Sequence, residues 1–136
     1  MNRVIQVSIV RHTKNYPAMV AFYRDLLSMH ITTTWDEPEN RGTLLSFGGQ
    51  ATNTVVEVID LGHEAMPGVQ PVNVVLSIEV ENVDTWHDQL LGRGVKIARG
   101  LENASWGHRS FGIDDPDGFR IWYYQDITQI SQAEKK

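Results

Sequence analysis

The alternation of apolar and polar residues is clearest between Ser105 and Gln125, where two apolar runs flank a turn-forming segment. The runs are Ser110–Ile113 and Phe119–Tyr124, and the sequence Asp-Asp-Pro-Asp-Gly separates them. Proline fixes φ near the value that an early turn position needs, and glycine accepts a positive φ without a steric clash. Phe, Ile, Trp and Tyr are typical of half-buried strands. The pattern therefore predicts a β-hairpin in this stretch.

The register of this hairpin decides which of its side chains share a face. We expect Asp114 and Phe119 to close the turn. Phe111 then lies across from Trp122. Because side chains alternate along a strand, the residues predicted on one face are Arg109, Phe111, Arg120, Trp122 and Tyr124. Aromatic residues are also predicted on the other face, so we expect both faces to be covered, one of them by a helix.

Helical and strand periodicities predict the remaining elements. Apolar residues recur at helical spacing in Ala18–Ser28 and again in Asn82–Arg93, which predicts two amphipathic helices. The polar stretch Asp36–Gly42 is predicted to be a loop, long enough to act as a covering loop. The stretches predicted as strands are Val4–Val10, Ile31–Trp35, Leu44–Phe47, Thr54–Ile59, Val72–Val80 and Val95–Ala98.

The two halves of the sequence repeat the same order of predicted elements. Gly42–Asp60 aligns with Gly107–Gln125 without a gap, at a shift of 65 residues. Each half then has the order β-α-β-β-β, which predicts an α+β fold of two βαβββ modules, each a mixed sheet with a helix. The expected boundaries are a first module at 1–61, a linker at 62–71, a second module at 72–127 and a polar tail at 128–136.

Composition limits the classes of protein that fit the sequence. The 136 residues suit one domain or two small modules, and the hydrophobic content of 41% is typical of a globular protein. The absence of cysteine excludes disulfides, thiolate metal sites and a cysteine nucleophile, and it agrees with a cytoplasmic location. With a net charge of −5 and scattered basic residues, no nucleic-acid groove is expected. No apolar run is long enough for a membrane span, so no membrane association is expected.

Several segments resemble the vicinal oxygen chelate superfamily, which includes glyoxalase I, extradiol dioxygenases and bleomycin-resistance proteins. The segments that carry the resemblance are Ala21–Met29, Leu76–Asp84, Arg93–Val95, Trp106–Phe111 and Asp115–Gly118. Together they place the likeness over about Val4 to Gln125, nearly the whole chain. The resemblance implies that each module curls its sheet into an open cup, with the helix on the outer face.

In metal-using members of that superfamily, four ligands from the first and last strands of the two modules bind a divalent ion. The resemblance places these positions at Gln6 or Ser8, Glu57, Val75 and Trp122. Valine and tryptophan cannot ligate a metal, which leaves Glu57 as a strong ligand and Gln6 as a weak one. The histidines lack the i, i+2 or i, i+4 spacing that places two imidazoles on one face. We therefore expect neither a cofactor nor a bound metal.

An indole at a former ligand position suits a flat or aromatic ligand, because it offers a large apolar face and one N–H donor. The aromatic residues expected to form this wall with Trp122 are Phe111, Tyr124, Trp106 and Trp35. The alternative is that they fill the core. Glu57 needs a partner in an apolar cup, because burying a lone carboxylate is costly. Arg109, Arg120 or a cationic ligand can supply that partner, and a structural Glu–Arg pair is the alternative to a ligand.

These features predict a metal-free small-molecule binding protein of the glyoxalase/bleomycin-resistance type, with an aromatic or cationic ligand in an aromatic-lined cup. The net negative charge of the chain favours cationic ligands. One alternative is a metal-dependent lyase, isomerase or dioxygenase of the glyoxalase type, with a divalent metal at Glu57. Another is a metal-free acid–base enzyme in which Glu57 is the catalytic base. We expect a homodimer, because the family usually closes its cups with two chains and an open apolar wall needs covering.

Overall fold

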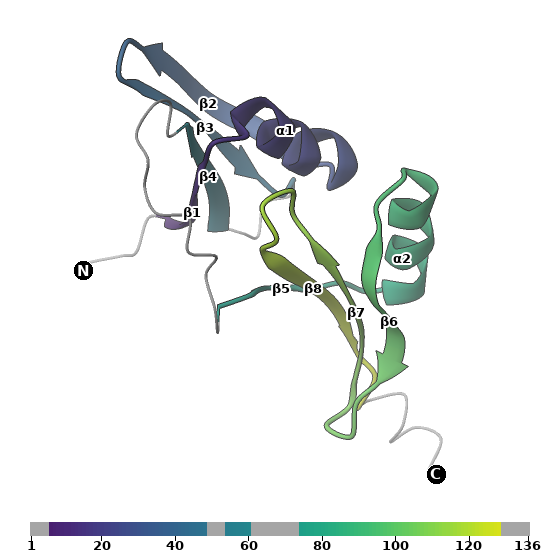
Figure 1. The fold of residues 1–136 in the computed structure, drawn as a ribbon. Helices are drawn as coiled ribbons and strands as arrows, with labels where there is room; N and C mark the ends of the chain where they lie inside the picture. Colours follow the sequence, from purple (N-terminus) through teal and green to yellow (C-terminus); the bar gives the residue numbers. More distant parts are fainter. Residues whose placement is uncertain (1–5, 49–53, 61–73, 129–136) are drawn as a thin grey trace, which may run out of the picture. The chain divides into compact units, whose positions relative to one another are not determined.

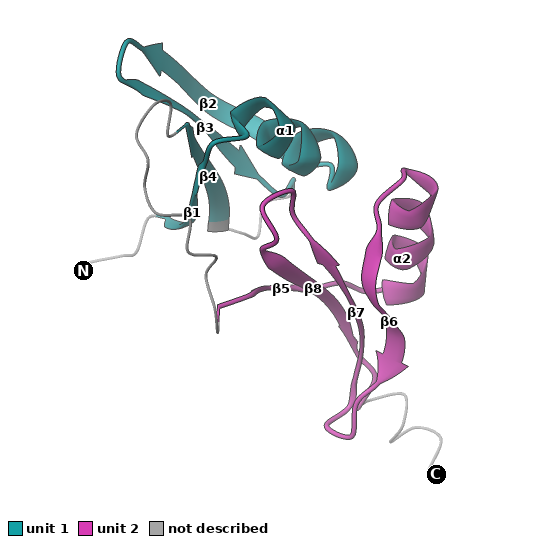
Figure 2. Cartoon of the chain, viewed as in Figure 1, with its two compact units in different colours: residues 1–69 teal, residues 70–136 magenta. Residues whose placement is uncertain are grey.

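The computed structural model describes residues 6–48, 54–60 and 74–128, which belong to two compact units (Figures 1 and 2). Unit 1 is Met1–Val69 and unit 2 is Gln70–Lys136. In each unit a four-stranded mixed sheet packs one of its faces against helical structure. The predicted α+β fold of two βαβββ modules is thereby confirmed.

The described elements of unit 1 are β1 Val7–Thr13, α1 Tyr16–Ala21, η1 Phe22–Leu26, β2 His30–Glu37, β3 Asn40–Ser46 and β4 Thr54–Asp60. Their spatial order is β1-β4-β3-β2, with β1 parallel to β4 and the other neighbours antiparallel. Pro17 fits the first turn of α1, where a missing N–H costs no hydrogen bond. The helix then widens into the π-helical turn η1, in which the Leu27 amide donates to the Phe22 carbonyl at 3.1 Å.

The core of unit 1 lies between its sheet and its helical segment. The largest side chains buried there are Met19, Tyr23, Leu27, Met29 and Leu45. Strand alternation places Leu45, Val56 and Val58 on the sheet face that contacts α1. The Tyr16 hydroxyl, which hydrogen-bonds the Thr43 hydroxyl, ties the helix to the same face. We call the opposite sheet face the open face of unit 1.

Unit 2 repeats this order with β5 Leu76–Glu79, α2 Val83–Gly92, β6 Ile97–Asn103, β7 His108–Asp114 and β8 Arg120–Asp126. Its sheet order is β5-β8-β7-β6, and its first strand again runs parallel to its last (Figure 1). Helix α2 follows the N-cap residue Asn82 and ends at the C-cap residue Arg93. Gly94 then adopts a φ of 89°, a conformation that a residue without a side chain reaches at little cost.

Aromatic stacking fills the space between α2 and the sheet of unit 2. Tyr123 is fully buried and stacks on Phe111 and on Trp86, with ring centroids 5.3 Å apart in both pairs. Leu90 of α2 is also fully buried. We call the sheet face opposite α2 the open face of unit 2.

The register of the β7–β8 hairpin differs by one residue from the predicted register. Phe111 pairs with Tyr123 instead of Trp122. Because neighbouring residues of a strand point to opposite faces, this shift moves Phe111 and Arg109 to the face that contacts α2. The prediction that these two residues share a face with Trp122 is therefore wrong.

The hairpin turn explains the shift. Asp114 pairs with Arg120, so five residues lie between the paired positions instead of four. The Asp115 amide donates to the Phe119 carbonyl at 2.9 Å, and the buried Asp115 carboxylate accepts from the Phe119 amide at 3.0 Å. Gly118 takes the positive φ of 88° that this loop needs. These local hydrogen bonds make the loop one residue longer than the sequence pattern predicts.

The segment Asp36–Gly42, predicted as a loop, is instead the end of a β-hairpin made by β2 and β3. Trp35 pairs with Gly42, and strand pairing continues to Glu37 and Asn40 beside the turn. Residues 36–41 are exposed to solvent, which accounts for their polar sequence. The prediction of a covering loop is wrong because polarity alone does not separate an exposed hairpin from a loop.

The predicted linker at 62–71 lies outside the described residues, and so does the predicted tail at 128–136 apart from its first residue. The boundary between the two compact units falls between residues 69 and 70. Of the helices within the described ranges, none is long and apolar enough to cross a membrane.

Candidate functional site

A row of aromatic side chains lies on the open face of unit 2. Trp122 and Tyr124 alternate with the buried Tyr123, so both project from the face opposite α2. Both are half-buried. Small residues flank Trp122, because its partners across the neighbouring strands are Ser77 on β5 and Gly112 on β7. The indole is therefore not enclosed by large side chains of these strands.

His108 on β7 extends this row. Its imidazole stacks on Tyr124, with ring centroids 4.4 Å apart and 20° between the ring planes. His108 pairs with Asp126 of β8, which places a carboxylate beside the stacked rings. We call Trp122, Tyr124 and His108 the aromatic row.

The Trp122 indole lies over the backbone of Gly112. A Cβ atom at residue 112 would lie 3.0 Å from indole Cζ3 and 3.2 Å from Cδ of Arg120, so a side chain there would crowd both. The guanidinium carbon of Arg120 lies 5.3 Å from the centre of the Trp122 ring. Nε of Arg120 also donates to Oδ1 of Asp114 at 2.5 Å. Arg120 is thus held beside the indole by an ion pair and a cation–π contact.

Arg109 and Phe111, both predicted to line the ligand site, face α2 and are not part of the open face. Nε and Nη2 of Arg109 donate to the two carboxylate oxygens of Asp84 at 3.0 and 2.9 Å. Nη1 of Arg109 donates to Oδ1 of Asn103 at 3.0 Å. The hydrogen bond from Arg109 holds the pKa of the Asp84 carboxyl below its usual value. Arg109 therefore ties the sheet to α2, and Phe111 is core.

Trp106 stands on the turn between β6 and β7, with 72% of its surface exposed. The next residue, Gly107, has a φ of 91°, and its carbonyl accepts from the Ile127 amide at 2.8 Å. The backbone of this turn is therefore held to the segment after β8. The indole itself faces solvent, which separates it from the half-buried aromatic row.

Glu57 is a half-buried carboxylate on the open face of unit 1. It pairs with Val10 on β1 and with Leu44 on β3, so apolar side chains flank it on both sides. Arg109 and Arg120, the two predicted partners, are engaged with other carboxylates. Among the described residues, Glu57 has no hydrogen-bond or ion-pair partner. A half-buried charge between apolar neighbours favours the approach of a cation.

Trp35 shares the open face of unit 1 with Glu57. Its indole lies over Gly42, where a Cβ atom would overlap the ring. Nε1 of the indole donates to Oδ1 of Asn40 at 2.8 Å. Trp35 therefore has a fixed orientation, and its N–H group is already used.

Strand pairing favours one of the two residues that the resemblance offers for the first ligand position. In unit 2, the strand partner of Trp122 is Ser77, and Val75 lies two residues before it. In unit 1, the strand partner of Glu57 is Val10, and the residue two positions before it is Ser8, not Gln6. The four positions are therefore a hydroxyl, a carboxylate, a valine and an indole.

This donor set does not fit a divalent metal. Zinc and the other first-row transition metals are held in proteins mainly by imidazole, carboxylate or thiolate groups, and only the carboxylate of Glu57 belongs to these classes. The described part of the chain also contains no group of three or more histidine, cysteine or acidic residues that could hold a metal ion.

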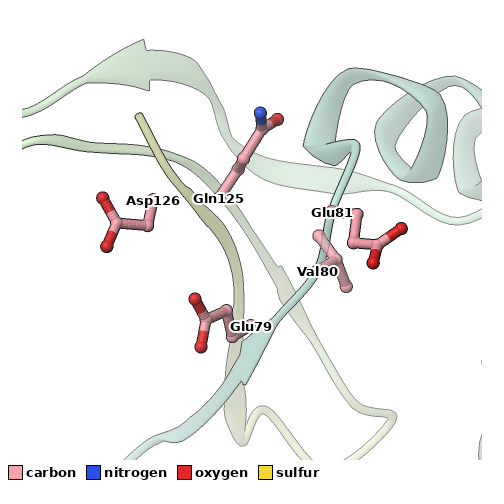
Figure 3. Close-up of a pocket in the computed structure, with 5 residues that line it drawn as sticks. All are labelled: Glu79, Val80, Glu81, Gln125 and Asp126. Carbon is pink, nitrogen blue, oxygen red and sulfur yellow. The ribbon is translucent and has the colours of Figure 1, made fainter. Parts of the chain in front are cut away.

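A pocket of about 480 Å³ lies in unit 2 where β5 and β8 end (Figure 3). The residues that line it are Glu79, Val80, Glu81, Gln125 and Asp126. Oε1 of Gln125 accepts from the Val83 amide at 3.2 Å, so this residue bonds the start of α2. No pattern in the sequence indicates this pocket. Glu79 and Asp126 are far apart in the chain, and only the parallel pairing of β5 with β8 brings them together.

Comparison with known proteins identifies relatives of this fold. The family model described as the Glyoxalase/Bleomycin resistance protein/Dioxygenase superfamily matches residues 5–123. No curated protein matches the chain. Among solved structures, the chain is similar to TnmS3, an antibiotic binding protein from Streptomyces sp. CB03234, with a TM-score of 0.73 and 20% identity, covering 93% of this chain and 98% of that chain.

Two further solved structures have the same fold. TioX from Micromonospora sp. ML1 has a TM-score of 0.67 and 14% identity, covering 89% of this chain and 98% of that chain. The trypanothione-dependent glyoxalase I of Leishmania major has a TM-score of 0.72 and 21% identity, covering 98% of this chain and 94% of that chain. At these identities the similarity is one of fold, and it includes a binding protein and an enzyme.

Proposed function

Because the chain belongs to the Glyoxalase/Bleomycin resistance protein/Dioxygenase superfamily, we propose that it is a metal-free protein that binds a small planar ligand on the open faces of its sheets. The observation that carries this proposal is Trp122, an indole at a position where metal-using members place a ligand. Tyr124 and His108 continue the same half-buried surface. Such a surface suits a flat aromatic molecule better than it suits an ion.

A cationic ligand is proposed for the open face of unit 1, and the residue that supports it is Glu57. Its carboxylate is half-buried beside Val10 and Leu44 and has no partner among the described residues. A cationic group on the ligand would supply that partner, and it would regain part of the solvation that the carboxylate loses. The net charge of −5 also attracts cations over longer distances. The ligand proposed for the open face of unit 1 is therefore cationic.

The similarity to TnmS3, an antibiotic binding protein, supports the binding class, although the 20% identity relates the two proteins by fold. We also propose that the protein acts as a homodimer, because each open face includes apolar surface that its own unit does not cover. Val10, for example, is 42% exposed on the open face of unit 1. Sedimentation at micromolar concentration measures this state, and a monomer there contradicts it.

The absence of a metal is tested by elemental analysis of the purified, dialysed protein. We expect far less than one equivalent of zinc, nickel, iron or manganese, because Glu57 is the only strong donor among the four implied positions. One retained equivalent that is lost in Glu57→Ala would overturn the metal-free assignment and revive the metal-dependent alternative.

Ligand binding is tested with proflavine, a planar tricyclic cation, and acridone, a neutral tricycle of similar shape. Both are titrated against the protein by calorimetry and by tryptophan fluorescence. Trp122→Ala removes stacking area, so we expect it to weaken both probes by about 1–3 kcal/mol. Trp106→Ala, which removes a solvent-exposed indole outside the aromatic row, is the matched control.

The outcome separates binding from a purely structural role of the aromatic row. Binding that depends on Trp122 and not on Trp106 supports the proposal. Equal binding by the wild type and Trp122→Ala places the ligand elsewhere. If neither probe binds and Trp122→Ala only lowers the melting temperature, the aromatic row is part of the core and the proposal is wrong.

A further inference from the structure

Charged side chains are distributed unevenly along the aromatic row. At the Trp122 end, Arg120 lies beside the indole in an ion pair with Asp114, and Arg99 of β6 pairs with Gly112 on the same face. At the Tyr124 end, the strand partner of Tyr124 on β5 is Glu79, and the strand partner of His108 is Asp126. Because Arg120 and Asp114 offset each other, the remaining charge is the cationic Arg99 at the Trp122 end and two carboxylates at the Tyr124 end.

We propose that this uneven charge orients the ligand, so that its cationic group lies at the Tyr124 end, between the stacked rings and the carboxylates of Glu79 and Asp126. This inference rests on the proposed function, since it needs a planar ligand on the aromatic row. It assigns a direction to the ligand and gives the pocket at the end of β5 and β8 a role in recognition.

The pocket shows which of its acidic residues belong to the open face. In Figure 3 the carboxylates of Glu79 and Asp126 point to the same side of β8, whereas Glu81 points away from them. Glu79 has no hydrogen-bond or ion-pair partner among the described residues. Asp126 accepts a hydrogen bond from the Thr128 amide at 2.9 Å, and no lysine or arginine of the described part of the chain pairs with it. Both carboxylates are thus available to bind a cation.

The stacked rings of Tyr124 and His108 add a second interaction for the same cation. The faces of aromatic rings attract cations, and this attraction adds to that of nearby carboxylates. At the opposite end, the Arg120 guanidinium already occupies the space beside Trp122 and is paired with Asp114, so this pair offers a ligand cation no net attraction. Attraction at one end and its absence at the other favour one orientation over its reverse.

The spacing of the row also indicates the size of the ligand. Trp122 and Tyr124 are two residues apart on β8, which corresponds to about 7 Å at about 3.4 Å per residue. Two or three fused rings cover this distance. The proposed ligand class is therefore a fused-ring planar cation whose positive group extends beyond Tyr124 toward the pocket.

The test compares two probes on the wild type and on two variants of the full chain at one fixed pH. The double variant Glu79→Gln/Asp126→Asn removes both open-face carboxylates and keeps the size of the side chains. The control Glu81→Gln removes one charge from the same pocket on the other side. Proflavine and acridone are titrated into each variant, and thermal melting confirms that each variant is folded.

We expect the double variant to weaken proflavine by about tenfold and to leave acridone unchanged, because only proflavine carries a positive charge. Glu81→Gln is expected to change neither affinity by more than about twofold. If both probes bind the wild type through Trp122 but the double variant changes neither, the proposed function stands and the orientation is wrong. If the double variant weakens both probes equally, the two carboxylates do not act through their charge, and the proposed orientation is wrong. If neither probe binds the wild type, both the proposed function and the orientation fail.

Discussion

Gly112 and Trp122 pair across β7 and β8, and the indole of Trp122 covers the backbone of Gly112. A Cβ atom at residue 112 would lie 3.0 Å from Cζ3 of the indole, which is closer than an ordinary van der Waals contact. The position of the indole on the open face therefore depends on the absence of a side chain at Gly112.

Gly112→Ala is expected to displace the Trp122 indole and to weaken planar ligands by about three- to tenfold, with a stability loss of about 1 kcal/mol. The displacement follows because the added methyl group competes with Cζ3 for space. Calorimetric titration of proflavine measures the affinity, and urea unfolding measures the stability. Gly100→Ala is the control, because a Cβ atom there meets no atom within 4 Å. Equal affinities for both alanine variants would contradict the role of Gly112.

Glu57→Gln is expected to weaken cationic ligands on the open face of unit 1 by about tenfold and to spare neutral ones, because it removes the charge and keeps the size of the side chain. The measurement is a parallel titration of proflavine and acridone. Glu37→Gln removes an exposed carboxylate from the same unit and serves as the control. Loss of acridone binding in Glu57→Gln would show that the residue acts through packing and not through its charge.

The Arg109–Asp84 pair is expected to make the packing of α2 sensitive to acid. Arg109 lowers the pKa of Asp84 from its usual 3.8, because its hydrogen bonds favour the carboxylate. The folded state therefore gains stability from this group above pH 3.8, and that gain is lost as the pH falls through the lower folded pKa.

Urea unfolding across this pH range tests the pair. The wild type should be more stable than Asp84→Asn at pH 7, and the difference should shrink well below pH 3.8. Arg109→Gln should show the same loss at pH 7, and the double variant should lose less than the sum of the two single variants. Additive losses would show that the two side chains act independently.

Tyr123→Phe is expected to keep or raise the stability of unit 2 by up to about 1 kcal/mol. The Tyr123 hydroxyl is buried without a hydrogen-bond partner in the described structure, and burial raises the pKa of Tyr123 well above its usual value. Phenylalanine keeps the stacking on Trp86 and removes the unsatisfied hydroxyl.

Tyr16→Phe is the comparison variant for Tyr123→Phe, because the Tyr16 hydroxyl does have a hydrogen-bond partner. Its hydroxyl is bonded to Thr43, so its removal should lower the stability of unit 1 by about 1 kcal/mol. Chemical unfolding of the two variants measures both effects. A clear loss of stability in Tyr123→Phe would indicate that its hydroxyl has a partner, such as a bound water.

The sequence by itself determined the repeated order of elements and the family. Strand and helix periodicities are local, and each half of the chain shows them in the same order, so the two βαβββ modules follow without knowledge of contacts. The identities of Glu57, Val75 and Trp122 are also sequence facts. They were sufficient to predict a poor metal donor set, because the chemistry of a ligand depends on residue type.

Only the tertiary structure decided which side chains share a face. The hydrogen bonds of the Asp115 carboxylate lengthen the β7–β8 turn by one residue, and this shift moves Phe111 and Arg109 away from Trp122. The parallel pairing of β5 with β8 joins Glu79 to Tyr124, although many residues separate them in the chain. Strand register depends on turn geometry and on contacts between distant segments, and neither is fixed by the periodicity of a single strand.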